Sequence, residues 1–407
     1  MYVWCLNGVR RGLAGLLGLS GVALVGCVTV DATQPPHASA LQASASNALT
    51  AAWPPRPVLI AHRGASALRP EHTLAAYRQA IEDGADIIEP DLVITRDGVL
   101  VARHENAIAI LNADGSVKEA TTDVADRPEF AARRATKSID GERITGWFTE
   151  DFTLAELKTL RARERIPKIR PANVRYDGQF EVPTLQEVID LARAETQRTG
   201  RTIGIYPETK HPTYFQSIGL PLDAPLLAVL EANGWNHAGA PVFVQSFETS
   251  NLRALRARST VRLVQLVAAS GRPYDLVAQA GTGRAPSYAD LVTPSGLVEI
   301  ATYANGIGAS KGMVVPVRDG ALAAPTALVA QAHAAGLVVH VWTLRPENAF
   351  LPLSLKRPLA TDGAVRGDAA AEMEAFLRSG VDGVFTDDPA VGRTALQRLR
   401  QGRPSPF

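Results

Sequence analysis

The sequence predicts an α/β fold, a (β/α)8 TIM-type barrel that is interrupted by an insertion. Apolar runs typical of buried strands alternate with segments of helical periodicity, at a spacing that predicts a parallel sheet. Residues 56–400 number 345, and 269 remain when the 76 residues of 106–181, where the alternation lapses, are set aside. This length is close to the roughly 250 residues of such barrels. A doubly wound open sheet is the alternative, but its first strand usually leads into a glycine-rich phosphate turn, and HRGAS at residues 62–66 is not one.

Each element is predicted from the period of its apolar residues and from the turn residues beside it. The predicted strands are residues 58–61, 87–95, 99–103, 202–210, 242–247, 261–268, 306–315, 338–344 and 384–386. The predicted helices begin at residue 71 and after residues 153 and 184, and occupy residues 224–233, 249–257, 291–304, 326–335, 368–378 and 389–399. Thr153 and Thr184 are each followed three residues later by Glu, a pair that caps a helix N-terminus. Pro90 cannot donate to a strand ladder, so we expect it at the end of its strand, where the ladder stops.

Residues 106–181 lack the alternation of strands and helices. They are rich in Arg and Ala, and three Asp-Gly pairs, which begin at residues 114, 140 and 177, mark turns. We therefore expect an insertion that covers the site rather than an independent domain. Residues 401–407 are a tail after the last predicted helix.

The N-terminus resembles the export signal of a bacterial lipoprotein. Arg10 and Arg11 precede an apolar run that is too short for a permanent membrane helix and ends in Gly26-Cys27. A small residue before cysteine resembles a lipobox, which implies that residues 1–27 are a signal and that Cys27 becomes lipidated. Ordinary signal cleavage nearby is the alternative. We expect a periplasmic protein of the bacterial cell envelope, held at the membrane by this lipid anchor.

The composition narrows the other possibilities. Residues 28–55 are rich in Ala, Ser, Thr and Pro, which predicts a flexible tether. The formal net charge of +1 favours neither nucleic acid nor a broad basic membrane patch. Both cysteines, Cys5 and Cys27, lie in the first 27 residues, so the rest of the chain has no disulfide or thiolate chemistry.

Three carboxylates at predicted strand ends are candidate metal ligands. Glu89 and Asp91 lie two residues apart on an apolar strand, so their side chains face the same side. Buried carboxylates must be paired or hold a metal ion. Glu208 ends a later strand, where an ordinary salt bridge to Lys210 is the alternative. Carboxylates without cysteines favour Ca²⁺ or Mg²⁺ over Zn²⁺.

Two histidines follow apolar runs beside these acids. His62 and His104 are candidates for a general acid and base, although either one alone is more often structural. Arg63 can hold phosphate as a guanidinium fork, and Lys210 can do so as a point charge.

Further strand-end residues carry less weight. Trp342 is a candidate apolar wall of the substrate pocket or a core residue, and Gln245 and Asp387 are candidate contacts to the substrate or to the other site residues. We expect His72 only to begin a helix.

The ordered motifs HRGA, PEHT, GADIIEPD, TRDGVLVARH, PETK and FTD resemble those of glycerophosphodiester phosphodiesterases, most closely the periplasmic branch of that family. The resemblance implies a (β/α)8 barrel with a small insertion after the second barrel strand. It also implies hydrolysis of substrates such as glycerophosphocholine and glycerophosphoethanolamine to glycerol 3-phosphate and an alcohol. The cofactor it implies is a divalent cation, with Ca²⁺ favoured over Mg²⁺.

Matched position by position, the resemblance implies that His62 and His104 are the acid/base pair. It places the metal ion on Glu89, Asp91 and Glu208, with Arg63 and Lys210 near the phosphate. One departure is that Glu105 stands where the family often has Asp. The sequence leaves open whether water or the glycerol 2-hydroxyl is the attacking group.

Two other functions are weighed against this one. A phospholipase of similar barrel design would act on intact lipid, but the sequence shows no apolar docking helix. A surface lipoprotein that binds its partner on an inactive barrel would have no need of both histidines and all three acids.

Overall fold

The structure, a computed structural model, describes residues 53–357 and 362–402. The predicted signal with Cys27, the tether up to residue 52 and the end of the tail lie outside the described residues. Among those described, no helix has the length and apolar character needed to cross a membrane.

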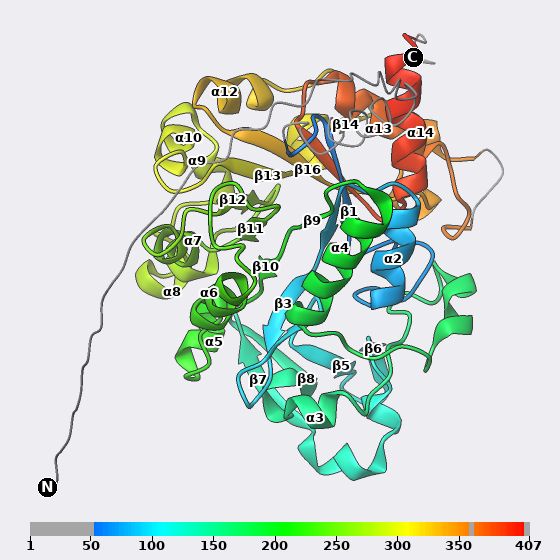
Figure 1. The fold of residues 1–407 in the computed structure, drawn as a ribbon, viewed down its shortest axis with the longest axis vertical. Coiled ribbons are helices and arrows are strands. Elements are labelled where there is room, and N and C mark those ends of the chain that lie inside the picture. Colours follow the sequence, from blue (N-terminus) through cyan, green and yellow to red (C-terminus); the bar gives the residue numbers. More distant parts are fainter. Residues whose placement is uncertain (1–52, 358–361, 403–407) are drawn as a thin grey trace, which may run out of the picture. The chain divides into compact units, whose positions relative to one another are not determined.

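The parallel strands of the eleven-stranded main sheet occupy eight positions around a barrel, in agreement with the predicted α/β barrel class. Figure 1 shows this curled sheet among its helices. In order around the barrel these strands are β1 (Val58–His62), β2 with β3 (Ile87–Glu89, Asp91–Ile94), β9 with β10 (Gly204–Ile205, Glu208–Thr209), β11 (Phe243–Ser246), β12 (Arg262–Val267), β13 (Gly306–Ser310), β16 (Val338–Leu344) and β17 (Gly383–Thr386). Each pairs in parallel with the next, and β17 pairs with β1, which closes the ring.

Two neighbouring barrel strands are interrupted by proline at the same level. Pro90 separates β2 from β3, and Pro207 lies between β9 and β10. Proline has no N–H to donate, but its carbonyl can still accept. The Glu208 N–H donates to the Pro90 carbonyl at 3.0 Å, and the Gln245 N–H donates to the Pro207 carbonyl at 2.9 Å. Our expectation that the ladder stops at Pro90 was therefore wrong, because the strand continues as β3.

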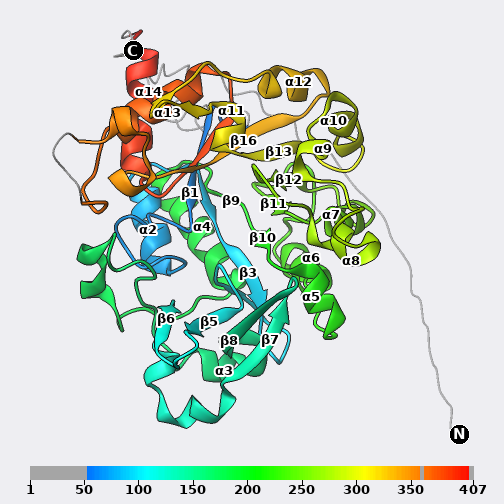
Figure 2. The same ribbon diagram turned by 180° about the vertical axis from the view of Figure 1, so that it is seen from behind.

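Helices surround the barrel (Figures 1 and 2). They are α2 (Leu74–Glu82), α4 (Leu185–Thr199), α6 (Asp223–Ala232), α7 (Thr249–Arg256), α10 (Pro294–Ile300), α12 (Leu328–Ala334), α13 (Ala369–Arg378) and α14 (Pro389–Arg400). The capping boxes of Thr153 and Thr184 are both present, before α3 (Leu154–Leu157) and α4. The other α-helices among the described residues are α5 (Pro212–Ser217), α8 (Tyr274–Ala280), α9 (Tyr288–Leu291) and α11 (Lys311–Val314).

The structure adds detail to two of the predicted strands. Strand β13 lies within the predicted segment 306–315 and ends at Ser310, because Lys311 begins α11. Strand β4 (Leu100–Ala102) is antiparallel to β3, since a tight turn joins them, and is therefore not a barrel strand. Trp53 is near the end of the segment predicted as a tether, and its ring packs 5.6 Å from that of Phe243 and 5.0 Å beneath the Arg262 guanidinium.

A separate antiparallel sheet lies within the region where the alternation lapses. Its order is β6-β5-β8-β7, formed by β5 (Ala107–Leu111), β6 (Val117–Ala120), β7 (Ala135–Ile139) and β8 (Glu142–Phe148). In Figures 1 and 2 it lies beside the carboxyl end of β3. Asp140 and Gly141, both with positive φ, form the turn between β7 and β8, as the Asp-Gly pair predicts.

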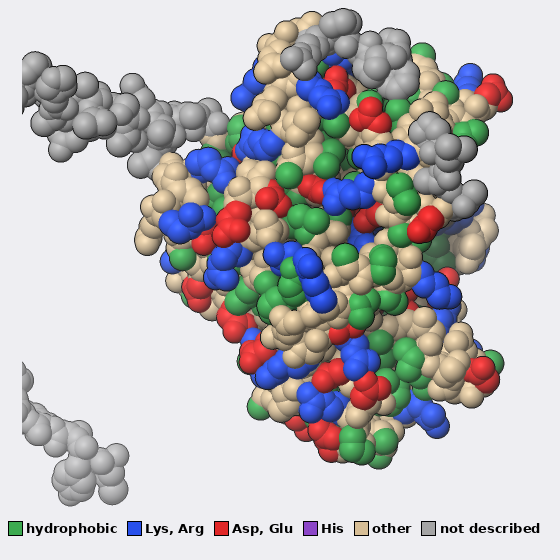
Figure 3. All heavy atoms as spheres, turned by 90° about the vertical axis from the view of Figure 1, so that its right-hand side faces the viewer, with side chains coloured by type: hydrophobic (Ala, Val, Ile, Leu, Met, Phe, Trp, Pro, Cys, Tyr) green, Lys and Arg blue, Asp and Glu red, His purple; other side chains and the backbone are tan. Residues whose placement is uncertain are grey.

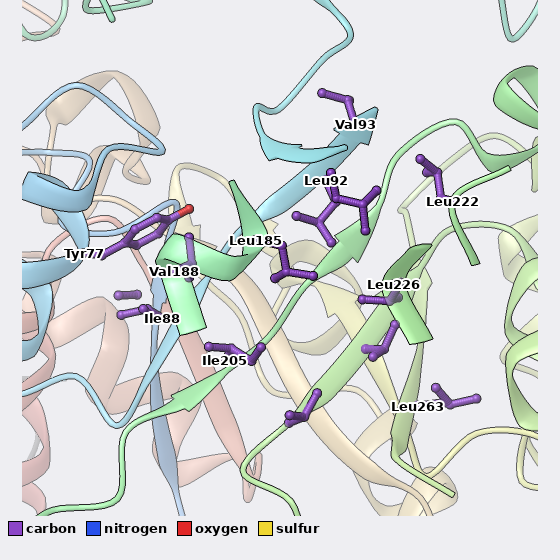
Figure 4. Packing of buried hydrophobic residues seen from close by; sticks show 14 of the residues in the cluster. Tyr77, Ile88, Leu92, Val93, Leu185, Val188, Ile205, Leu222, Leu226 and Leu263 are labelled. Carbon is purple, nitrogen blue, oxygen red and sulfur yellow. The ribbon is translucent and has the colours of Figure 1, made fainter. Parts of the chain in front are cut away.

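The apolar core has two main parts. The larger fills the space between the barrel and its helices, as Figure 4 shows for Leu185 and Val188 of α4 beside Ile88 and Ile205. The smaller fills the barrel itself and includes Tyr206. On the face shown in Figure 3, basic and acidic side chains are interspersed, consistent with the net charge of +1.

The chain leaves β1 through a left-handed turn at Arg63 and Gly64, with φ of 59° and 86°. A Cβ on Gly64 would lie 2.7 Å from the backbone carbonyl carbon of Ala76, so only glycine fits there. This turn presents the Arg63 N–H to the Glu89 carboxylate at 2.8 Å.

We expect Gly64→Ala to lower the free energy of unfolding by roughly 1–3 kcal/mol more than Gly98→Ala does. Gly98 has a similar φ of 83°, but nothing lies within 4 Å of its added Cβ, so that variant measures the backbone cost alone. Urea unfolding of both variants checks this. An equal decrease in the free energy of unfolding of the two variants would show that the backbone at residue 64 shifts to accommodate the added Cβ.

Candidate active site

One pocket at the carboxyl ends of the barrel strands brings the predicted site residues together. All nine side chains that the sequence indicated for the acid/base, metal and substrate positions line it: His62, Arg63, Glu89, Asp91, His104, Glu208, Lys210, Gln245 and Trp342. They come from five barrel strands and from the residues that follow them, with His104 after β4 as the exception. Residues more than 250 positions apart in the chain therefore share one cavity.

Three buried carboxylates form the floor of this pocket. One oxygen each of Glu89, Asp91 and Glu208 lies within 4.8 Å of the others, and these residues are 1%, 1% and 6% exposed. Burial, together with the charges of Asp91 and Glu208, raises the pKa of Glu89 well above its usual range. Burial also raises the pKa of Glu208, to about 8. The three carboxylates outnumber the cationic side chains beside them, and their donor atoms are the oxygens that a hard cation prefers.

Neighbouring groups fix the orientation of each carboxylate. The Gln245 amide nitrogen donates to Glu89 at 3.2 Å, and the Lys210 ammonium lies 3.0 Å from Glu208. The salt bridge considered as an alternative for Glu208 is thus present, and it lies within the cluster. Arg63 approaches Asp91 with its Nε at 3.3 Å and shares its guanidinium with Glu71.

His72 does more than begin a helix, which corrects our expectation. It directly precedes Thr73, the cap of α2, and is fully buried with a φ of 55°. Its Nε2 lies 2.8 Å from Asp91, and its Nδ1 lies 2.8 Å from the Tyr77 hydroxyl. Although burial opposes ionisation of Asp91, the hydrogen bond from His72 holds the pKa of that carboxyl well below its usual range.

His62 is held by a carboxylate from the far end of the chain. Its Nδ1 lies 2.6 Å from Asp387, which follows β17. Asp387 is bonded in turn by the guanidiniums of Arg170 and Arg345, the latter at 3.0 Å. Burial, with the charge of Arg63, lowers the pKa of His62 to about 4, so the ring is neutral near pH 7. With Nδ1 bonded to Asp387, Nε2 is left to take up or release a proton.

His104 has a similar arrangement. Its Nδ1 lies 3.0 Å from a carboxylate oxygen of Glu105. Burial, with the charges of Arg63 and Lys210, lowers the pKa of His104 to about 3, so this ring is also neutral. The pocket therefore presents two neutral imidazoles, each with a carboxylate at Nδ1.

Aromatic side chains close one wall of the pocket. The Trp342 indole N–H donates to the Gly308 carbonyl at 2.8 Å, and its ring meets Phe247 edge-on at 5.7 Å. Trp342 is thus both a pocket wall and a packed residue.

Sequence reasoning missed several charged partners. Arg345 directly follows β16, so the strand-end rule used for the other candidates could have found it. His211 directly follows the predicted strand 202–210, so the same rule could have found it. Arg170 lies in a stretch without a comparable signal, and only the folded chain shows its contacts.

Comparison with known proteins agrees with this geometry. Residues 62–391 match the model of the glycerophosphoryl diester phosphodiesterase family. Glycerophosphodiester phosphodiesterase GDPD6 of Arabidopsis thaliana is 35% identical over 345 residues, which are 82% of this chain and 84% of the plant protein. The glycerophosphodiester phosphodiesterase of Haemophilus influenzae is 28% identical over 363 residues, 84% of this chain and 90% of that one.

The fold is also shared with a solved protein of Silicibacter pomeroyi. The TM-score is 0.56 at 20% identity, with 88% of this chain and 98% of that chain covered. The family match over most of the chain and the identity with its relatives show that this chain is an enzyme of the glycerophosphoryl diester phosphodiesterase family.

Proposed function

We propose that this pocket hydrolyses glycerophosphodiesters, such as glycerophosphocholine and glycerophosphoethanolamine, to glycerol 3-phosphate and an alcohol in the presence of a divalent cation. The observation that carries the proposal is the convergence of three buried carboxylates, two neutral imidazoles and two cationic side chains in one cavity. These are the groups needed to bind a phosphodiester, to remove a proton from the attacking hydroxyl and to supply one to the leaving alcohol.

The pocket fits a hard divalent cation. Glu89, Asp91 and Glu208 would hold it, and the Gln245 side-chain oxygen, which is buried without a hydrogen-bond partner among the described residues, is a fourth oxygen in the same pocket. Ca²⁺ accepts six to eight oxygen ligands, including amide oxygens, whereas Mg²⁺ requires a tight octahedron. We therefore propose Ca²⁺ ahead of Mg²⁺. When bound, the cation would offset the charge that develops on the phosphoryl oxygens.

The chain's own side chains would bind the phosphate and transfer the protons. Lys210 and Arg63 hold positive charge in the pocket, since neighbouring carboxylates raise the pKa of each despite burial. One imidazole of the pair His62 and His104 accepts the proton of the attacking hydroxyl, from water or from the glycerol 2-position. The other imidazole first takes up a proton on Nε2 from solvent, and then donates that proton to the alcohol oxygen as its bond to phosphorus breaks.

A second hollow, which adjoins the pocket at His104, is our proposed place for the alcohol. It runs along the four-stranded sheet of residues 107–148, which we propose is the insertion after the second barrel strand. Its walls combine apolar with mainly acidic side chains: Ile110, Ile139, Ile144, Glu105, Glu119, Asp140, Glu142, Arg165 and His211. Four carboxylates against two cations favour a positively charged head group, and the isoleucines favour one with apolar surface.

The cellular location rests on residues 1–27 alone. We propose that Cys27 carries a lipid anchor and that the enzyme belongs to the periplasmic branch of its family, because the charged start, the apolar run and the Gly-Cys pair occur in that order.

We expect His62→Ala and His104→Ala each to lower kcat by roughly 10²–10⁴-fold, because each removes one proton transfer. Release of glycerol 3-phosphate from glycerophosphocholine measures this, and an unchanged melting temperature shows that the fold persists. His237→Ala, which changes an exposed histidine, is the matched control. Turnover of His104→Ala at the level of the unaltered chain would contradict the assignment, and release of diacylglycerol from liposomes would favour the phospholipase instead.

We expect chelation to abolish turnover and Ca²⁺ to restore it better than Mg²⁺ or Zn²⁺. The cation should also raise the melting temperature, since a ligand at about 100 times its Kd stabilises the folded state by about 2.7 kcal/mol. Thermal unfolding with chelator and with Ca²⁺ measures this gain, and Glu89→Gln should abolish it. A gain of the same size in that variant would place the ion elsewhere.

A further inference from the structure

A chain of four side chains connects the small sheet to His104. The carboxylate of Glu105 lies between two rings, with one oxygen 3.0 Å from Nδ1 of His104 and the other 2.6 Å from Nε2 of His211. On its far side, His211 places Nδ1 2.6 Å from Asp140, in the turn between β7 and β8. The order is therefore Asp140, His211, Glu105, His104.

His211 is held where it can restrain Glu105. His211 follows Lys210, just beyond the end of β10. Its φ of 48° and ψ of 46° are a left-handed conformation, which costs a residue other than glycine roughly 1–2 kcal/mol. Burial alone would lower the pKa of the His211 ring, but the hydrogen bonds with Asp140 and Glu105 raise it to about 9, so both nitrogens carry protons near pH 7. Each nitrogen then donates to a carboxylate.

Glu105 needs such a restraint. Its side chain is 28% exposed, and it directly follows the residue whose ring it contacts, so its carboxylate is free to turn towards solvent unless a second donor holds it. Asp387, which does the same for His62, is 2% exposed and has two arginines as donors. Each imidazole of the pair thus has a carboxylate partner, and each carboxylate is fixed by a cation from another part of the chain.

We propose that His211 is a positioning residue for the reaction: it clamps Glu105, which in turn fixes the orientation of His104 and keeps the proton on its Nδ1. This inference rests on the proposed acid/base role of His104. His211 also lines the second hollow, where its charge bears on substrate binding, but its effect on the proton transfer is exerted only through Glu105 and His104. Asp140 orients the His211 ring through its contact with Nδ1.

Two amide substitutions separate the clamp from a structural role. The glutamine side chain places its amide nitrogen near the position of histidine Nε2, which faces Glu105. The asparagine side chain is one carbon shorter and reaches only the position of Nδ1, which faces Asp140. His211→Gln therefore retains the donor to Glu105, whereas His211→Asn retains only the link to Asp140.

We expect kcat of His211→Gln to stay within about threefold of the unaltered enzyme, and kcat of His211→Asn to fall about tenfold or more. KM should change by the same factor in both variants, because both lose the same charge from the wall of the second hollow. In protein with ¹⁵N-labelled histidine, the nitrogen shifts of His104 should report a proton on Nδ1 in the Gln variant, and a mixture of tautomers in the Asn variant. Melting temperatures of both variants show whether each is folded.

Equal kcat values in the two folded variants, or the same His104 nitrogen shifts in both, would overturn the inference. His104→Ala, assayed in parallel, distinguishes this from a failure of the proposed function. If His104→Ala is inactive while the Asn and Gln variants behave alike, only the clamp is refuted. If His104→Ala retains full turnover, the acid/base role fails first, and the clamp fails with it.

Discussion

Mutual repulsion among Glu89, Asp91 and Glu208 is the constraint on which the rest of the site depends. Three carboxylates that lie within 4.8 Å of one another and are nearly inaccessible to water cannot all remain ionised without positive charge beside them. Arg63 and Lys210 supply part of that charge, and His72, whose pKa burial lowers, donates a hydrogen bond to Asp91. Glu89 and Glu208 still have raised pKa values, so the protein alone leaves the cluster short of positive charge, which a divalent cation would supply.

The barrel brings these three mutually repelling carboxylates together by placing two interrupted strands side by side. Pro90 and Pro207 break neighbouring strands at one level, and Glu89, Asp91 and Glu208 directly flank these breaks. The two imidazoles then enter by different routes, His62 at the end of β1 and His104 after the antiparallel β4. Around them, loops from distant parts of the chain supply Asp387, Arg170 and His211. The barrel thus supports the carboxylates, and the loops orient the imidazoles.

Much of the fold could be predicted from the sequence, because local signals are strong where helices begin and strands are buried. The capping boxes at Thr153 and Thr184 and the boundaries of β16 are examples. The nine candidate residues that line the pocket were identified because each ends, or lies beside, a predicted strand. Asp387 was a candidate for the same reason, but its pairing with His62, 325 positions away, could not be predicted. His72 and His211 reach their carboxylates through a left-handed backbone that no local pattern indicates.

The most direct measurement of the central claim is anomalous diffraction from crystals of this chain grown with Ca²⁺. If these carboxylates hold the cation, we expect one calcium peak per chain, about 2.3–2.6 Å from an oxygen of each of Glu89, Asp91 and Glu208. Well-ordered carboxylates with only Arg63 and Lys210 as partners, and no peak between them at saturating Ca²⁺, would contradict it.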